Sequence, residues 1–257
     1  MSKKQTVNGS PSLFPVFKLS FFFILSIALL LLSSTYAQSE EEKGEKKLKT
    51  VHSKLHLLHG RLSEEYPEQL MVATFLPEDA VVLELGGNVG RNSCVIASIL
   101  KNPYNLVVAE SSPSIAKQLQ ENRNHNGMHF HIEVAAISKV PLVQNFWSTI
   151  PSATDIPGYF RVNTITFADL EKKYNLTFDT LVVDCEGALY YMLRDDPSIL
   201  KNIRLVIIEN DFVDPQHYKD VAALFKANGL KLVYTKALEH VPTPLPCKDY
   251  FFQVWSK

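Results

Sequence analysis

One stretch of the chain, residues 81–90, constrains the fold more than any other. It reads Val-Val-Leu-Glu-Leu-Gly-Gly-Asn-Val-Gly. A β-branched apolar run ends in an acid and a glycine-dense turn, and residues 91–100 then place apolar side chains at positions that suit a helix. The pattern predicts a strand, a tight loop and a helix, which is the repeating unit of α/β folds.

The glycines of this loop also indicate a ligand. Gly86, Gly87 and Gly90 offer a backbone without side-chain bulk, and the helix that follows offers unpaired N–H groups to an anion. The spacing differs from a dinucleotide-binding G-x-G-x-x-G motif, because Asn88 and Arg91 stand where the second and third glycines would be. The phosphate-binding G-x-x-x-x-G-K-[ST] pattern is absent from the sequence. A purely structural glycine turn, or another nucleotide-binding fold, stays open as an alternative.

Strand and helix patterns alternate through the rest of the chain, which predicts a largely parallel sheet covered by helices on both faces. The last two strands are separated by a proline-rich loop. After the first strand, we expect strands at residues 106–109, 128–134, 178–183, 205–208, 230–234 and 250–255.

Acidic residues follow several of these strands. Glu110 comes about twenty residues after the glycine turn, where an acid in a βαβ unit accepts hydrogen bonds from ribose hydroxyls. A surface glutamate is the plainer interpretation. Asp184 and Glu186 end a buried strand, and Glu209 and Asp211 end the next one. Because open α/β sheets bind ligands at the carboxyl ends of their strands, these acids are candidate site residues.

Two of these segments together resemble a known family. Residues 84–90, E-L-G-G-N-V-G, are similar to the first motif of class I S-adenosylmethionine-dependent methyltransferases, in particular the FkbM-like family with its D-x-G-A-N-x-G. Residues 183–189 resemble that family's I-D-x-E-G-x-E, with Leu189 in place of the last acid. Residues 162–170 resemble its V-x-T-x-T-L-D-D-L, with Ala168 in place of one acid. The resemblance implies a Rossmann-like fold with a mostly parallel seven-stranded sheet and an antiparallel last strand.

The resemblance also implies S-adenosylmethionine as cofactor. Glu84 would help to hold its ammonium group, Glu110 would bind its ribose, and Ala136 would lie beside its adenine. The methionine portion would be cradled by the loop residues Gly86, Gly87, Asn88 and Gly90.

For catalysis, Asp184 is predicted to orient the acceptor hydroxyl and to take its proton, with Glu186, Glu209 and Asp211 shaping the site. The same oxygen ligands would suit a divalent ion such as Mg²⁺, but we predict no metal site, because these acids serve equally as hydrogen-bond acceptors.

The resemblance implies an O-methyltransferase, and we expect a hydroxylated acceptor such as a glycan. The missing acids at Leu189 and Ala168 leave one alternative from another class, a catalytically silent, membrane-tethered binding module that keeps the fold. Lys plus Arg (26) nearly balance Asp plus Glu (27), so no overall charge favours nucleic acid as a partner. The oligomeric state is not predicted.

Residues 140–161 interrupt the alternation. They contain prolines, a glycine and aromatic residues without a helical or strand period, and they are long for a simple connection. We expect an irregular loop that covers the substrate side of the site. Trp147 and Tyr159 are candidate stacking surfaces there, unless they only pin the loop to the core.

The N-terminal region suggests a membrane segment. Residues 1–18 carry lysines and form a predicted cytosolic leader, and residues 19–39 contain no charge and are long enough to span a bilayer. A cleavable signal peptide is the alternative, since small residues precede Gln38. Both interpretations place the rest of the chain on the lumenal or extracellular side, as a single-pass membrane protein of the endomembrane system or as a secreted protein.

We predict a charged stem at residues 40–50, disordered or weakly helical, followed by the methyltransferase domain at residues 51–257. Residues 51–75 would form a helical cover, because Val51, Leu55, Leu58 and Leu62 recur at helical spacing.

Overall fold

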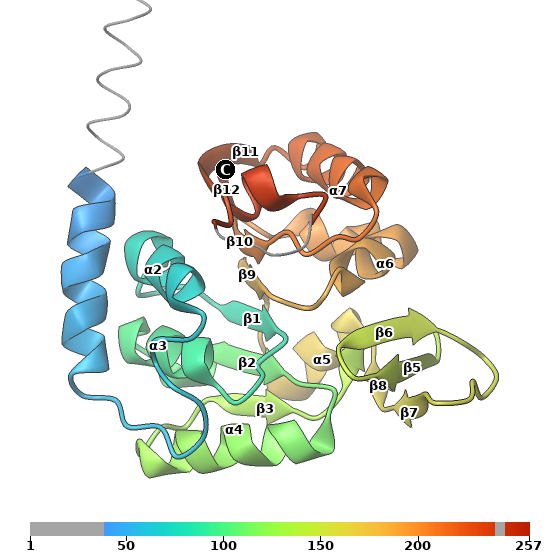
Figure 1. The fold of residues 1–257 in the computed structure, drawn as a ribbon, viewed down its shortest axis with the longest axis horizontal. Coiled ribbons are helices and arrows are strands. Elements are labelled where there is room, and N and C mark those ends of the chain that lie inside the picture. Colours follow the sequence, from blue (N-terminus) through green and yellow to red (C-terminus); the bar gives the residue numbers. More distant parts are fainter. Residues whose placement is uncertain (1–38, 240–244) are drawn as a thin grey trace, which may run out of the picture. The chain divides into compact units, whose positions relative to one another are not determined.

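The computed structural model describes residues 39–239 and 245–257 (Figure 1). The chain divides into two compact units, Met1–Glu40 and Glu41–Lys257. The second unit contains the sheet, the cavity and every contact described below.

The centre of this unit is a seven-stranded sheet with the strand order β11-β12-β10-β9-β1-β2-β3. Strands β10, β9, β1, β2 and β3 are parallel to one another, and β12 runs antiparallel to both β10 and β11. The predicted α/β fold with an antiparallel last strand is therefore confirmed. The strands are β1 (Val82–Leu85), β2 (Leu106–Ala109), β3 (His131–Glu133), β9 (Thr180–Val183), β10 (Leu205–Glu209), β11 (Lys231–Lys236) and β12 (Phe252–Ser256).

Both faces of the sheet are buried, as the continuous apolar runs of its central strands require. In β1, Val82 belongs to one hydrophobic cluster, and Leu83 and Leu85 belong to the other. Helices α2, α3 and α4 contribute to the first cluster, and helices α5, α6 and α7 to the second (Figure 1). The helices are α2 (Tyr66–Phe75), α3 (Arg91–Ile99), α4 (Pro113–His125), α5 (Phe167–Tyr174), α6 (Ala188–Asp195) and α7 (Pro215–Ala227), with short 3₁₀ turns at Pro103–Asn105, Pro197–Lys201 and Lys248–Tyr250.

Residues 140–161 form strands, and the prediction of an irregular loop was wrong. Strands β5 (Leu142–Asn145), β6 (Ser148–Pro151) and β7 (Phe160–Val162) form an antiparallel sheet in the order β6-β5-β7. A short pair, β4 (Ala136–Ile137) and β8 (Thr164–Ile165), flanks it. These strands are too short to produce a visible period of two, which explains why the sequence pattern did not reveal them.

The segment after the predicted stem also differs from expectation. Residues 39–52 are helical, and the helix predicted over residues 51–62 has already ended by residue 53. The side chain of Asn122 on α4 accepts hydrogen bonds from the backbone of Leu58 and His59, at 2.6 and 3.1 Å, and Asn126 accepts one from His56 at 2.9 Å. These bonds satisfy backbone groups that a helix would otherwise have paired, so the segment lies extended along α4.

The localisation prediction has to be corrected. Within residues 39–239 and 245–257, no helix is long and apolar enough to cross a membrane. The predicted leader and all of the predicted membrane segment except Ser39 lie outside the described residues. On this finding, the assignment as a single-pass membrane protein with a lumenal domain is withdrawn.

Candidate active site

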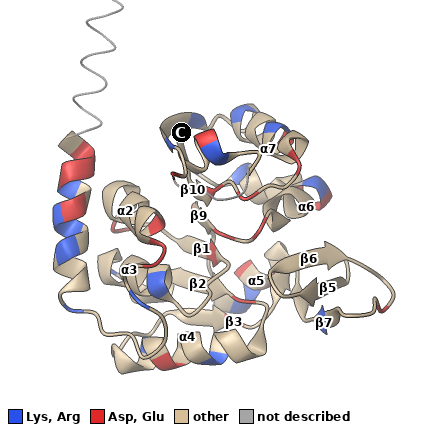
Figure 2. Cartoon of the chain, viewed as in Figure 1, with Lys and Arg blue, Asp and Glu red and all other residues tan. Residues whose placement is uncertain are grey.

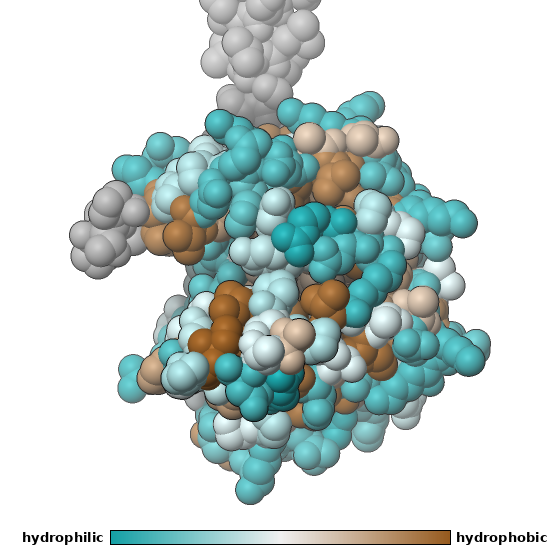
Figure 3. All heavy atoms as spheres, turned by 90° about the vertical axis from the view of Figure 1, so that its right-hand side faces the viewer, coloured by the Kyte–Doolittle hydropathy of each residue, from teal (hydrophilic) through white to brown (hydrophobic). Residues whose placement is uncertain are grey.

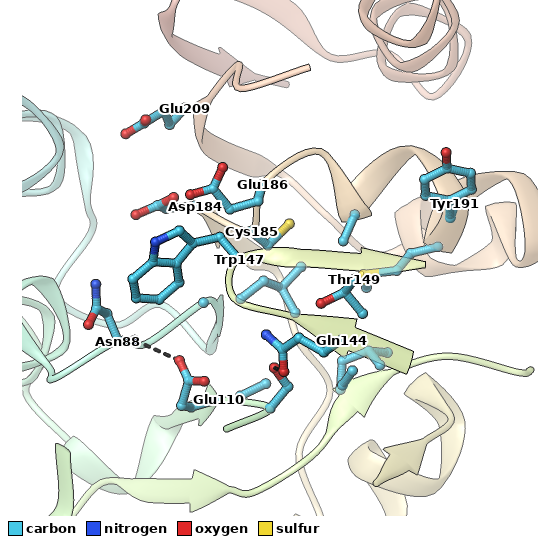
Figure 4. A pocket seen from close by; sticks show the side chains of 18 of the residues that line it. Asn88, Glu110, Gln144, Trp147, Thr149, Asp184, Cys185, Glu186, Tyr191 and Glu209 are labelled. Carbon is cyan, nitrogen blue, oxygen red and sulfur yellow. Dashed lines mark hydrogen bonds between the residues drawn. The ribbon is translucent and has the colours of Figure 1, made fainter. Parts of the chain in front are cut away.

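A cavity of about 460 Å³ opens at the carboxyl edge of the sheet (Figure 4). Its walls come from the loops after β1, β2, β9 and β10, from the first turn of α2, and from the small sheet formed by β5 and β6. The structure thus brings together seven of the residues predicted from the sequence, namely Gly86, Asn88, Glu110, Ala136, Asp184, Glu186 and Glu209. The other four predicted residues, Glu84, Gly87, Gly90 and Asp211, do not line the cavity in the described part of the chain.

Glu110 ties the loops after β1 and β2 together. Its Oε2 accepts a hydrogen bond from the backbone N–H of Asn88 at 2.9 Å, and its Oε1 accepts one from the N–H of Ser112 at 2.8 Å. Burial raises the pKa of Glu110, although these backbone N–H groups lower it in part. A carboxylate offers about four acceptor sites, so the group keeps capacity to accept a further hydrogen bond from a ligand hydroxyl.

The glycines of the first loop are required by the protein's own packing. Gly86 has a φ of +86°, and a Cβ at this position would overlap the carbonyl oxygen of Asp184. A Cβ at Gly87 would overlap Val108, and one at Gly90 would overlap Leu119. The loop after β1 therefore lies directly against the end of β9 and against α4, whether or not a ligand is bound.

Asp184 follows β9 and faces several other acids. Burial raises its pKa well above the ordinary value, and the negative charges of Asp211, Glu65, Glu68 and Glu186 raise it further. A carboxylate with a raised pKa is a stronger base than a free aspartate.

Asp211 holds the loop that carries Asp184 rather than lining the cavity. Its Oδ1 accepts a hydrogen bond from the backbone N–H of Gly187 at 2.7 Å, where α6 begins. Burial and the charge of Glu186 raise the pKa of Asp211 to about 7.

Glu68 is a site residue that the sequence analysis missed. It lies in the first turn of α2, is 8% exposed and lines the cavity. Burial, a hydrogen bond with Glu68 and the charge of Asp184 raise the pKa of Glu209 to about 12. No local pattern marks Glu68, because α2 was expected only to cover the core.

Glu65 also lines the cavity and was missed. Its Oε1 accepts a hydrogen bond from Asn88 Nδ2 at 3.2 Å and forms an ion pair with Arg91 at 2.7 Å. Unlike Glu68, this carboxylate has a cation beside it, which it shares with Glu64.

Glu84 lies inside β1, behind the cavity. It is 2% exposed, and its Oε2 has no hydrogen-bond partner among the described residues. Burial raises the pKa of Glu84 to about 8, and the neighbouring Ser93 and Asn92 offset this only in part. Its role toward a cofactor stays a prediction.

The small sheet covers one side of the cavity. Gln144 on β5 accepts a hydrogen bond from Ser111 Oγ at 3.0 Å, which joins the sheet to the loop after β2. Trp147, in the turn between β5 and β6, is 54% exposed and lines the cavity, with its indole between Asn88 and Asp184 in Figure 4. Tyr159 does not line it. The side of the molecule shown in Figure 3 carries patches of apolar surface. On the small sheet, Phe146 and Phe160 are exposed aromatic residues.

The lining is acidic, and Figure 2 shows Asp and Glu gathered near the ends of the central strands. Among the described residues that line the cavity there is no Lys, Arg or His. No group of three or more potential ligands in the described ranges is arranged to hold a metal ion. The carboxylates of the lining are Glu65, Glu68, Glu110, Asp184, Glu186, Asp195 and Glu209.

The sequence matches no family model and no curated protein. Solved structures resemble the chain at low identity. A protein of the NADB-Rossmann superfamily from Streptococcus agalactiae is 14% identical, with a TM-score of 0.49, over 77% of this chain and 70% of its own. An O-methyltransferase from Bacillus cereus, solved in complex with SAH, is 16% identical, with a TM-score of 0.46, over 85% of this chain and 91% of its own.

Fibrillarin from Aeropyrum pernix, solved with natively bound S-adenosyl-L-methionine, is 14% identical, with a TM-score of 0.42, over 75% of this chain and 73% of its own. Likenesses this distant carry no argument about activity. The resemblance to the FkbM-like family therefore stays a prediction, and the functional proposal depends on the site itself.

Proposed function

We propose that the chain is an S-adenosylmethionine-dependent methyltransferase that methylates a hydroxyl group of a neutral or cationic acceptor, such as a glycan. The observation that carries the proposal is the acidic composition of the cavity, whose described lining contains seven carboxyl groups and no cationic side chain.

This lining fits the charge of the proposed cofactor. S-adenosylmethionine carries a sulfonium and an ammonium group against a single carboxylate, so its net charge is positive. In a cavity that is partly shielded from water, nearby carboxylates stabilise such a ligand. A dinucleotide would instead bring its pyrophosphate against the same carboxylates, so the proposal disfavours a nicotinamide cofactor.

The hydrogen-bonding groups fit as well. Glu110 would accept hydrogen bonds from the ribose hydroxyls with the acceptor capacity that its backbone donors leave. The methionine portion would lie beside Gly86 and Asn88, and the adenine beside Ala136, since these residues line the same cavity as Glu110.

When bound, the cofactor would supply a methyl group already activated on sulfur, so the protein's task is alignment and proton removal. Asp184 would accept a hydrogen bond from the acceptor hydroxyl and take its proton as the new C–O bond forms. The neighbouring acids that raise the pKa of Asp184 would make it a stronger base for this step. Asp211 would act through the loop, by fixing the N–H of Gly187.

The cavity also indicates the acceptor. Trp147 and Tyr191 line the same cavity as Glu186, and aromatic faces combined with carboxylate acceptors suit a polyhydroxylated molecule. Phosphate, sulfate or carboxylate near the reacting hydroxyl would be repelled.

The test is calorimetric titration of the full chain with S-adenosylmethionine and, separately, with NAD, comparing wild type with Glu110→Ala. We expect binding of S-adenosylmethionine that weakens at least tenfold in the variant, and no binding of NAD. Transfer of labelled methyl groups to neutral glycans would then be screened. A folded chain that does not bind S-adenosylmethionine would overturn the proposal.

A further inference from the structure

The cavity is small for a cofactor and a complete acceptor together. Its volume of about 460 Å³ lies toward the lower end of the roughly 300–1,000 Å³ that hold one drug-sized molecule, and S-adenosylmethionine is a molecule of that size. The cofactor would therefore fill most of the cavity, and only the reacting part of an acceptor would fit beside it. The rest of a larger acceptor would have to lie on the surface that adjoins the cavity.

The small sheet provides a surface of this kind. The residues of β5 and β6 that line the cavity alternate along each strand and so share one face of the sheet, namely Leu142, Gln144, Thr149 and Pro151. Figure 4 shows Gln144 and Thr149 on this face. Phe160 on β7 is paired with Gln144, and residues paired across antiparallel strands share a face. Because Phe160 is 47% exposed and does not line the cavity, this face continues past the cavity onto β7.

The turn between β5 and β6 gives a second, independent observation. Phe146 in this turn has a φ of +50° and is 84% exposed, and it precedes Trp147, which lines the cavity. A positive φ disfavours a bulky side chain, and glycine or asparagine is the usual residue at such a position of a hairpin turn. A phenylalanine that costs conformational energy and buries little surface in the fold indicates contact with a partner.

The charge of the small sheet indicates the chemistry of that partner. Residues 142–162 contain one acid and one base, Asp155 and Arg161, which pair with each other at 2.8 Å. The sheet therefore offers no unpaired cation to a nucleic acid or an acidic peptide. Its aromatic rings are interleaved with amide and hydroxyl side chains, such as Gln144 and Thr149. Sugars match this mixture, because their C–H faces stack on aromatic rings and their hydroxyls bond to polar side chains.

We propose that Phe146, Trp147 and Phe160 form a binding surface for a neutral oligosaccharide chain, of which the unit to be methylated enters the cavity. The proposal rests on the proposed function, because the chain is the acceptor of that reaction. Phe146 and Phe160 lie on different elements of the sheet and would contact different units of the chain. Both would determine specificity for chain length and take no part in methyl transfer itself.

The test measures methyl transfer by the full chain to neutral glucose- and xylose-based acceptors, from the single sugar to chains of increasing length. The variants are Phe160→Thr, which keeps a residue suited to a strand, and Phe146→Asn, which accepts a positive φ. Phe160→Tyr keeps the ring and should behave as wild type. Tyr104→Ser is the matched control, because Tyr104 is an exposed aromatic residue that precedes β2, at the opposite edge of the sheet.

In wild type, KM should fall as the acceptor is lengthened while kcat stays similar. Phe160→Thr and Phe146→Asn should each raise KM for the longer chains by about three- to tenfold, and leave kcat and the KM of the single sugar unchanged. Tyr104→Ser should change none of these values. Phe146→Asn should unfold at a temperature no lower than wild type, so a loss of folding would not account for its effect.

Equal KM values for single sugars and chains in wild type, or unchanged KM values in both variants, would overturn the proposal. So would a wild type that binds S-adenosylhomocysteine but methylates no acceptor of the series. Two further results would assign the surface to another occupant: binding to phosphatidylcholine vesicles that Phe146→Asn abolishes, or a dimer that Phe160→Thr dissociates. Failure of wild type to bind S-adenosylhomocysteine would instead count against the proposed function.

Discussion

Asp184 is the residue on which the proposed chemistry depends. Its carboxyl faces Glu186, Glu68 and Glu65, and burial together with their charges raises its pKa. A raised pKa makes Asp184 a stronger base toward the hydroxyl proton, whereas an asparagine can orient the hydroxyl but accept no proton.

We therefore expect Asp184→Asn to lower methyl transfer by about 10²- to 10⁴-fold while the affinity for S-adenosylmethionine stays within about threefold. In wild type the activity should fall as the pH drops through the raised pKa of Asp184, because the base becomes protonated. Methyl-transfer rates and calorimetric affinities for S-adenosylmethionine, measured over a range of pH, test both statements. Asp249→Asn, at an exposed position, is the control. Unchanged turnover in Asp184→Asn would remove this residue from the mechanism.

A second single residue, Glu84, leads to a prediction about the stability of the fold. Its pKa is about 8 in the folded chain against an ordinary value of 4.5. Between these values the unfolded chain loses the proton and the folded chain keeps it, so the free energy of unfolding should fall as the pH rises from 4.5 to 8. The full effect corresponds to about 5 kcal/mol as an upper bound.

The variant Glu84→Gln should remove the share of this dependence that Glu84 contributes, while Asp211 and Glu209, whose pKa values are also raised, keep the remainder. Urea unfolding should give a shallower fall in stability across the pH window than in wild type, and a higher stability than wild type at the alkaline end. The acceptor atoms Ser93 Oγ and Asn92 Oδ1 lack partners in the described residues and are available to the new amide. A pH dependence identical to that of wild type would contradict the assigned burial effect.

At the scale of elements, the contact between the loops after β1 and β9 builds the site. We expect Gly86→Ala to destabilise the fold by about 3 kcal/mol or more, since it combines a positive φ with an overlap against the backbone of Asp184. Gly127→Ala is the control, because its φ is +64° but a Cβ there meets nothing within 4 Å. It should cost only about 1 kcal/mol. Equal losses in the two variants, measured by chemical denaturation, would show that the loop contact contributes nothing.

The elements that could be predicted are those whose signals are local. The strands before the glycine loop and before Asp184 are continuous apolar runs followed by defined polar residues, so the sheet was predicted correctly. That this edge binds a ligand stays a prediction. The extended segment around Leu58 was not predicted, because its conformation depends on the side chains of Asn122 and Asn126, more than 60 residues away.

Within the site, Glu68 could not be predicted from the sequence for the same reason. Its importance arises from where α2 packs, next to Glu209 at the end of β10, and a tertiary contact of this kind leaves no trace in spacing.

At the scale of the whole folded unit, the helix at residues 39–52 belongs to the core. Leu48 is fully buried in the cluster that includes α2 and α3, and Glu41 forms an ion pair with Lys236 at 3.1 Å. The stem predicted from the charge of residues 40–50 is therefore packed on the sheet unit, because its single buried leucine outweighs the polar character of its neighbours.

Leu48→Ala should lower the free energy of unfolding by about 2–5 kcal/mol, the usual cost of a cavity in a core. Leu58→Ala, at a position that is 57% exposed, should change it by less than about 0.5 kcal/mol. Thermal and urea unfolding of both variants would measure the change in the free energy of unfolding. A negligible effect of Leu48→Ala would show that the helix does not contribute to the stability of the folded unit.

The acidic wall of the cavity has a consequence for turnover. Methyl transfer converts a sulfonium into a neutral thioether, so the spent cofactor carries one positive charge less than the fresh one. A wall of carboxylates would distinguish the two by charge alone and would release the spent form more readily. We expect S-adenosylmethionine to bind more tightly than S-adenosylhomocysteine, with a ratio of affinities that shrinks as the acids are protonated at low pH. The same electrostatics that attract the methyl donor would then limit inhibition by the product.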